Sequence, residues 1–200
     1  MLHNSILNKE NFDSIFQKLA DLYVSKVPTE KVDVFIVGGC AILLQFNYRL
    51  STMDIDAIFN ENDFFIQCVE EISKEMNLPP DWLNQDFVDT PSYSPKIVEV
   101  ASLYKTFNNF INVYITNTEY LIAMKLKSSR PTGGDLDDIV KMVYELRYNG
   151  STITYRDVIN AYEFLYSDYS NTYSYFLEKT KEAFEKPLEE IAELIDCKRL

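Results

Sequence analysis

A chain of 200 residues, of which 46% are hydrophobic, is long enough for one domain with a sizeable core or for one domain with a helical extension. The formal net charge of −12 argues against broad, non-specific binding to nucleic acid, which needs a basic surface, but it permits a small basic pocket for one nucleotide or one RNA end. The single histidine, His3, argues against a catalytic histidine and against zinc sites with histidine ligands.

The chain has no apolar run long enough for a transmembrane helix, and its first residues lack the basic region and apolar core of a signal peptide. The three cysteines, Cys40, Cys68 and Cys197, share no metal-binding or redox spacing. Scattered thiols in odd number indicate a reducing compartment, so we expect a cytoplasmic protein without membrane contact.

The first part of the chain alternates helical and strand patterns. Apolar spacing and β-branched runs predict helices over residues 9–26, 38–46 and 62–76, and strands over residues 32–37 and 53–59. Residues 77–95 carry several prolines and are interpreted as an irregular loop with one short helix. Two further strands, over 97–103 and 110–115, are close enough to form a hairpin.

The second part of the chain is helical. A capping box at Thr116-Asn117-Thr118-Glu119 predicts a helix over 117–129. Another helix carries Leu136 to Leu146 and ends at Asn149-Gly150, Thr154 opens the next, and residues 171–197 form one or two acidic helices broken near Pro187. We therefore predict an α/β core over residues 1–116 and a helical region over 117–200 packed on it.

Two short motifs carry the chemistry. Gly38-Gly39, between a strand and a helix, allows the backbone to approach a phosphate at the helix N-terminus, or it serves a tight turn that needs positive φ. Asp54 and Asp56 alternate along a strand and so face the same side, where they can hold a divalent cation; the plainer interpretation is the solvent face of an edge strand. Because the two motifs occur together, we favour the functional interpretation of both.

These motifs resemble the signature of the nucleotidyltransferase superfamily, which has the polymerase-β-like fold. Arg49-Leu50-Ser51-Thr52 is similar to the stretch that commonly precedes the first aspartate in that superfamily. The resemblance implies an α+β fold of the nucleotidyltransferase type, with a small mixed sheet flanked by helices and followed by a C-terminal helical region.

The downstream sequence strengthens this resemblance. Residues 121–126, Arg130 and residues 135–139 are similar to a region typical of bacterial nucleotidyltransferase-like proteins related to AbiE-type toxins of toxin–antitoxin systems. Residues 82–84 resemble a segment of an uncharacterised branch of that group. The resemblance extends from residue 34 to about residue 145.

The family implies transfer of a nucleotide from a nucleoside triphosphate to an acceptor hydroxyl, with Mg²⁺ or Mn²⁺ as cofactor. By resemblance, Asp54 and Asp56 are the metal ligands and catalytic residues. Nucleotide binding falls to Gly38, Gly39, Arg49, Thr52, Lys125 and Arg130. The last two side chains are ordinary solvated helix residues in the plainer interpretation.

Four further polar residues are candidates for supporting or catalytic roles. Asp135 is predicted mainly as a helix N-cap, whereas Asp138 is expected to pair with Lys125 or Arg130 and orient it. Active members often carry a third carboxylate on a neighbouring strand, where this chain has Asn112, and Glu99 is the other candidate. Without a third carboxylate, deprotonation of the acceptor lacks an obvious base.

Two functions therefore remain open beside a structural protein with a vestigial pocket. The first is a Mg²⁺-dependent nucleotidyltransferase in a toxin–antitoxin or phage-defence system, whose acceptor is an RNA end, a protein hydroxyl or a small molecule. The second is a non-catalytic nucleotide-binding, regulatory or antitoxin module on the same fold. Either fits a two-component system with a protein partner.

Overall fold

The computed structural model describes residues 7–60, 62–130, 132, 134–167 and 174–196, so the predictions for His3 and Cys197 lie outside the described residues. Its contacts divide the chain into two compact units. The first unit comprises Met1–Val88 and Val98–Thr116, and the second comprises Asp89–Ile97 and Asn117–Leu200. Among the described residues, no helix combines the length and apolar character needed to cross a membrane.

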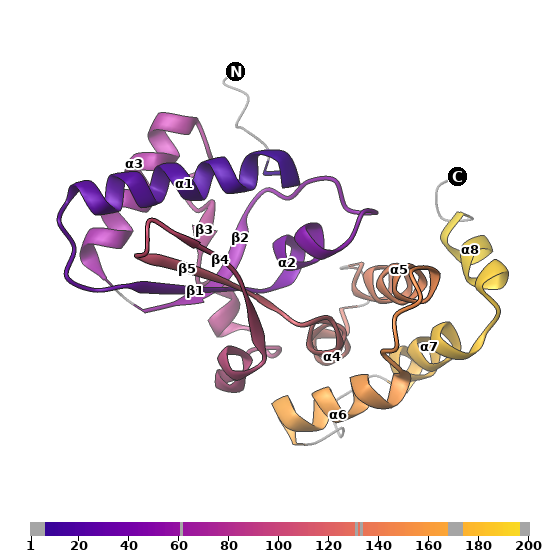
Figure 1. The fold of residues 1–200 in the computed structure, drawn as a ribbon. Helices are drawn as coiled ribbons and strands as arrows, with labels where there is room; N and C mark the ends of the chain where they lie inside the picture. The colour runs from indigo at the N-terminus through magenta and orange to yellow at the C-terminus, as the bar shows by residue number, and fades with distance from the viewer. Residues whose placement is uncertain (1–6, 61, 131, 133, 168–173, 197–200) are drawn as a thin grey trace. The chain divides into compact units, whose positions relative to one another are not determined.

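The first unit is built on a five-stranded mixed sheet, as predicted (Figure 1). The strand order is β3-β2-β1-β5-β4, with β1 antiparallel to β2 and parallel to β5. The strands are β1 (Val32–Ile36), β2 (Ile55–Phe59), β3 (Leu83–Asn84), β4 (Ala101–Phe107) and β5 (Ile111–Thr116). The predicted α+β class is therefore confirmed.

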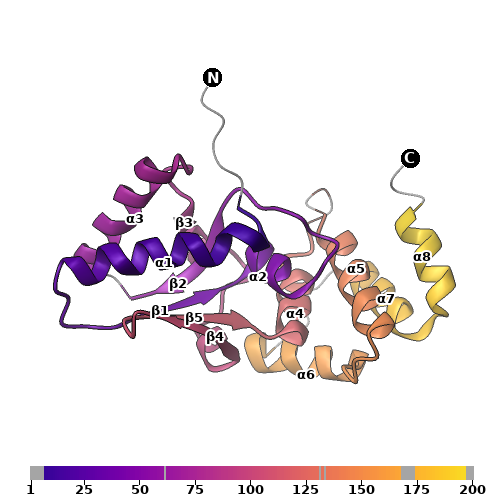
Figure 2. The same cartoon turned by 45° about the horizontal axis from the view of Figure 1, so that its top comes forward.

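Alternating burial along the strands places the core on one face of this sheet. In β1, Val32, Val34 and Ile36 are buried, and the equivalent alternate residues of β2 and β5 are buried with them. The helices α1 (Lys9–Ser25) and α3 (Asp63–Met76) lie side by side over a face of the sheet, as the two views show (Figures 1 and 2). Both helices were predicted from their apolar spacing, and so was α2 (Gly38–Gln45).

The segment between α3 and β4 differs from its prediction. Residues 97–99, expected in a strand, belong to the 3₁₀ helix η2 (Pro95–Glu99), and the strand itself runs from Ala101 to Phe107. The Ile97 N–H donates to the carbonyl of Ser94, which closes a turn where a ladder bond was expected. The loop also contains η1 (Asp86–Asp89) and the two-residue strand β3, which no periodicity in the sequence indicates.

The described part of the second unit is helical. Its helices are α4 (Thr118–Ser128), α5 (Asp135–Tyr148), α6 (Tyr155–Tyr166), α7 (Ser174–Glu185) and α8 (Leu188–Asp196). The break between α7 and α8 falls at Pro187, and the capping box at Thr154 is formed, as predicted. The capping box expected at Thr116 is not: Asn117 is the N-cap of α4, and the Thr116 hydroxyl donates instead to the carbonyl of Ile36 at 3.1 Å.

Candidate functional site

The turn from β1 into α2 brings two charged side chains against the paired glycines. Gly38 has φ +59°, and a Cβ atom there would lie 2.9 Å from Oδ2 of Asp56. A Cβ atom at Gly39 would lie 2.7 Å from Nη2 of Arg49 and 3.4 Å from Oγ1 of Thr52. The glycines are therefore needed for two reasons: the positive φ at Gly38, and the close approach of Asp56 and Arg49 to the start of α2.

The two predicted metal ligands lie at the start of β2. Asp54 is exposed and directly precedes β2, whereas Asp56 lies within it and is half-buried. The Thr52 hydroxyl donates to Oδ1 of Asp54 at 3.5 Å, and the Val37 N–H donates to the carbonyl of Asp56 at 3.0 Å. Asp56 is thus held by the sheet as well as by the glycine turn.

The thiol of Cys40 lies in the first turn of α2, where the charges of this cluster affect its pKa. Burial raises the pKa of Cys40 far above its usual range; Arg49 lowers that pKa, and Asp54 and Asp56 raise it further. Both carboxylates and the guanidinium therefore lie near the same point of α2. A thiol held neutral in this way is no nucleophile, which leaves two carboxylates and a guanidinium as the charged groups of the cluster.

An antiparallel bridge between Leu7 and Thr52 fixes the loop that carries Arg49 and Thr52. The Leu7 N–H donates to the Thr52 carbonyl at 3.2 Å, and the Thr52 N–H donates to the Leu7 carbonyl at 2.9 Å. Leu7 and Thr52 are both buried. No pattern in the sequence indicates this contact, because it joins two segments outside the periodic elements.

The register of the sheet locates the candidates for a third carboxylate. Asn112 lies opposite Asp33, near the start of β1, and donates to its Oδ1 at 2.7 Å. Asp56 lies at the other end of β1, because the register of β1 and β2 places it opposite Val37, one residue after that strand ends. Asp33 and Val37 are four residues apart, so Asn112 and Asp56 are separated by about 13 Å along the strand direction. The residue of β5 that continues the register beside Val37 and Asp56 is Thr116.

Glu99 ends η2, is exposed, and precedes β4, which is separated from β2 by two strands. Within the described part of the chain, no three histidine, cysteine, aspartate or glutamate side chains are grouped so that they could hold a metal ion. The role of Glu99 as a third carboxylate stays a prediction.

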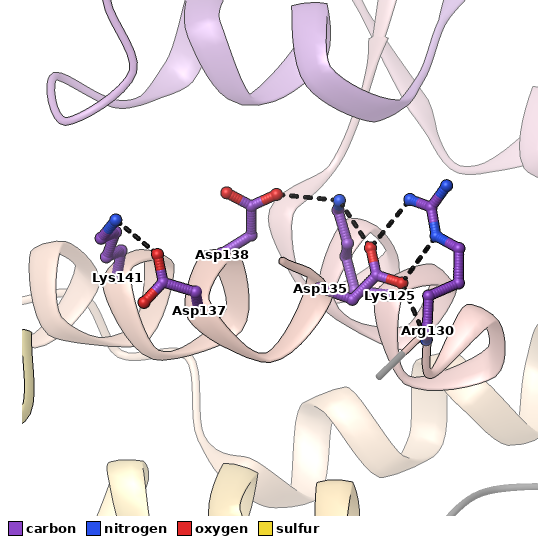
Figure 3. A network of polar contacts seen from close by, with 6 residues as sticks. All are labelled: Lys125, Arg130, Asp135, Asp137, Asp138 and Lys141. Carbon is purple, nitrogen blue, oxygen red and sulfur yellow. Dashed lines mark hydrogen bonds and ion pairs between the residues drawn. The ribbon is translucent and has the colours of Figure 1, made fainter. Parts of the chain in front are cut away.

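Lys125, Arg130, Asp135 and Asp138 form an ion-pair network in the second unit (Figure 3). The Lys125 ammonium lies 2.9 Å from Asp135 and 2.8 Å from Asp138, which confirms the predicted pairing of Asp138. The Arg130 guanidinium donates twice to Asp135, through Nε and Nη2 at 3.0 Å each, and its backbone N–H donates at 3.1 Å.

The N-cap role predicted for Asp135 is wrong. The N-cap of α5 is Gly134, and Asp135 is the first residue of the helix, with its side chain fully buried against the two cations. Burial alone would raise the pKa of Asp135, but the hydrogen bonds from Arg130 and the charge of Lys125 outweigh it and hold that pKa well below its usual range. Lys125 is 13% exposed and Arg130 is 63% exposed, and their roles in phosphate binding stay predictions.

A comparison with protein families now identifies the chain. The family model described as "Nucleotidyltransferase of unknown function (DUF6036)" matches residues 10–176. The chain belongs to this family. No curated protein and no solved structure matched it.

Membership in DUF6036 confirms the predicted resemblance at the level of a nucleotidyltransferase family, and such families in general use a divalent metal and a nucleoside triphosphate. The matched region includes the glycine turn, Arg49 and both aspartates of the first unit, together with the ion-pair network of the second. The finer resemblance to AbiE-type toxins stays a prediction.

The first prediction concerns the turn of this DUF6036 protein. We expect Gly38→Ala to lower the free energy of unfolding by about 2–3 kcal/mol. Alanine is strained at positive φ, and its Cβ would clash with the Asp56 carboxylate. Gly150→Ala is the matched control: Gly150 has φ +73° with open space around the Cβ position, so it should lose only about 1 kcal/mol. Urea denaturation measures both, and equal losses would contradict the contact with Asp56.

The second prediction concerns Asp135. We expect Asp135→Asn to cost about 3 kcal/mol at neutral pH, because it leaves the largely buried Lys125 ammonium undercompensated and removes the carboxylate that the exposed Arg130 guanidinium binds. Asp137→Asn, which removes the partly exposed pair with Lys141, should cost less than about 1 kcal/mol.

The pH dependence gives a second readout for Asp135. Because its pKa is lower in the folded state, its contribution is present above the unfolded pKa of about 3.9 and is lost as the pH falls toward the folded value. The stability difference between wild type and Asp135→Asn should therefore be constant from about pH 5 upward and shrink below about pH 4 in urea titrations. A difference that stays constant down to pH 3 would contradict the lowered pKa.

Proposed function

We propose that this protein binds a nucleoside triphosphate with Mg²⁺ or Mn²⁺ at the start of α2 and transfers the nucleotide to an acceptor hydroxyl. The observation that supports this most directly is the meeting of Gly38, Arg49, Asp54 and Asp56 at one helix N-terminus in a member of a nucleotidyltransferase family. Carboxylates, a guanidinium and a helix N-terminus together match a metal-bound polyphosphate.

The donor set at the start of β2 fits a magnesium ion that arrives with its substrate. Mg²⁺ is usually held by one or two carboxylates, and substrate phosphates and water complete its shell. Asp54 and Asp56 would supply the carboxylates, and Arg49, beside Gly39, would contact phosphate oxygens. When bound, the ion would neutralise charge on the polyphosphate.

In the proposed reaction the acceptor oxygen forms a bond to the α-phosphorus, the bond from that phosphorus to the β-bridging oxygen breaks, and pyrophosphate leaves. The hydroxyl proton goes to a general base or to solvent. Glu99, the exposed last residue of η2, is the candidate base. A toxin–antitoxin or phage-defence setting, in the cytoplasm and with a protein partner, is part of this proposal and follows the resemblance to AbiE-type toxins.

A second candidate is a non-catalytic nucleotide-binding or regulatory module. It is favoured by one observation: the described residues hold no group of three potential ligands around Asp54 and Asp56. Such a module would retain metal-dependent nucleotide binding and lack transfer.

The third prediction tests both candidates through ligand-dependent stability. ATP or GTP with Mn²⁺, at about 100 times the Kd, should raise the melting temperature by about 5–10 °C, because the ligand binds only the folded state. The double variant Asp54→Asn, Asp56→Asn should remain folded and lose this shift. Asp33→Asn, an aspartate on β1 hydrogen-bonded to Asn112, is the matched control and should retain it.

Transfer is then measured with α-labelled triphosphate and candidate acceptors. Label on an acceptor supports the enzyme, whereas a thermal shift without transfer to any tested acceptor favours the binding module. If no nucleotide shifts the melting temperature of the wild type, or if the double variant keeps the full shift, the proposed site is wrong.

A further inference from the structure

We propose that Leu7, the residue before the N-cap of α1, is a positioning residue for the metal–nucleotide site. Its backbone bridge to Thr52 holds the 46–54 loop, which joins α2 to β2, in the geometry that binding needs. This inference rests on the proposed function, since it assigns the element that orients the ligands of that site. The bridge, the loop and the start of α1 lie within the first unit, and in both views the loop passes beside the start of α1 (Figures 1 and 2).

The 46–54 loop carries most of the charged groups of the proposed site. Arg49 and Asp54 belong to this loop, whereas Asp56 lies in β2. The pairing of β2 in the sheet fixes Asp56, but Arg49 and Asp54 lie outside the helices and strands. Groups on loops are held less precisely than groups on helices and strands. The loop therefore needs an anchor of its own.

Burial along the loop is concentrated at Thr52. Leu50 is 79% exposed and Met53 is 58% exposed, although both side chains are large and apolar. Over residues 47–54, all of which the structure describes, Thr52 alone is buried. A segment with few buried contacts opens at little cost in free energy. The position of the loop thus depends on what holds Thr52.

Leu7 holds Thr52 through the main chains of both residues. The two N–H groups donate to each other's carbonyls, at 3.2 Å from Leu7 and at 2.9 Å from Thr52, and the Leu7 side chain is fully buried. Leu7 is itself fixed, because the next residue, Asn8, is the N-cap of α1 and forms a capping box with Asn11. The bridge therefore ties the loop to a helix whose beginning is well defined.

Thr52 transmits this restraint to the charged groups. Its hydroxyl donates to Oδ1 of Asp54 at 3.5 Å. A Cβ atom at Gly39 would lie 3.4 Å from the same hydroxyl oxygen and 2.7 Å from Nη2 of Arg49, so both side chains reach the start of α2. A misplacement of about 1 Å can cost an active site about 100-fold in activity. Loss of the bridge should therefore weaken nucleotide binding although every ligand is still present.

A purely structural role for Leu7 leads to a different expectation. In that case Leu7 contributes only apolar burial, so its truncation lowers the melting temperature as truncation of any core leucine does. The nucleotide affinity of the molecules that remain folded then stays unchanged. Affinity and stability, measured on the same samples, separate the two roles.

The fourth prediction compares Leu7→Ala with Leu19→Ala, the matched control, because Leu19 is a fully buried leucine of α1 outside the bridge. Both variants should lower the melting temperature. Calorimetry is done at a temperature where circular dichroism shows each variant to be folded. Leu7→Ala should raise the Kd for ATP with Mn²⁺ about tenfold or more, because it removes the side chain that seats the bridge, whereas Leu19→Ala should match the wild type.

Two further variants of Leu7 test the same contact. Leu7→Met keeps the side-chain volume and both backbone bonds, so it should bind ATP as the wild type does. Leu7→Pro removes the N–H that donates to Thr52, so it should raise the Kd even if Leu7→Ala does not fold.

The outcomes separate this inference from the proposed function. If the wild type binds ATP with Mn²⁺ and folded Leu7→Ala or Leu7→Pro binds it equally well, the positioning role is wrong and the nucleotide site stands. An equal loss of affinity in Leu19→Ala would also overturn the inference, because it would show a general effect of destabilisation. If the wild type itself binds no nucleotide, the proposed function fails instead.

Discussion

The approach of the Asp56 carboxylate to the backbone of Gly38 is the constraint on which the candidate site depends. It fixes β2 against the start of α2 at the point where β1 ends, and the Val37 N–H bonded to the Asp56 carbonyl reinforces it. The carboxylate is therefore positioned by the register of the sheet. Sites supported by strands and helices in this way are held more precisely than sites on loops alone.

The sequence predicted the elements whose pattern is local. α1, α3 and the helices of the second unit follow their apolar spacing, and β1 and β5 follow their β-branched runs. It could not predict β3, which is two residues long and exists through its pairing with β2, or the bridge between Leu7 and Thr52. Both depend on contacts between distant segments, about which periodicity carries no information.

The same limit explains what the sequence showed of the site. It identified the two glycines and two aspartates as a unit, but it explained the glycines by phosphate approach or a tight turn. The structure adds a reason that spans the loop: Asp56 and Arg49 occupy the space that side chains at Gly38 and Gly39 would need. Asp135 is the converse case, because its position suggested a cap, and its real partners, Lys125 and Arg130, come from the preceding helix and loop.

The two charged clusters differ in their balance of charge. Lys125, Arg130, Asp135 and Asp138 balance two positive against two negative charges, and the deepest carboxylate is fully buried. Arg49, Asp54 and Asp56 together carry a net charge of −1 and include an exposed carboxylate. A network with balanced charges needs no further counter-ion, whereas an excess of carboxylate at a helix start can be compensated by a divalent cation, which in turn attracts a polyphosphate. This asymmetry of charge supports the proposal that the nucleotide binds at the start of α2 in the first unit.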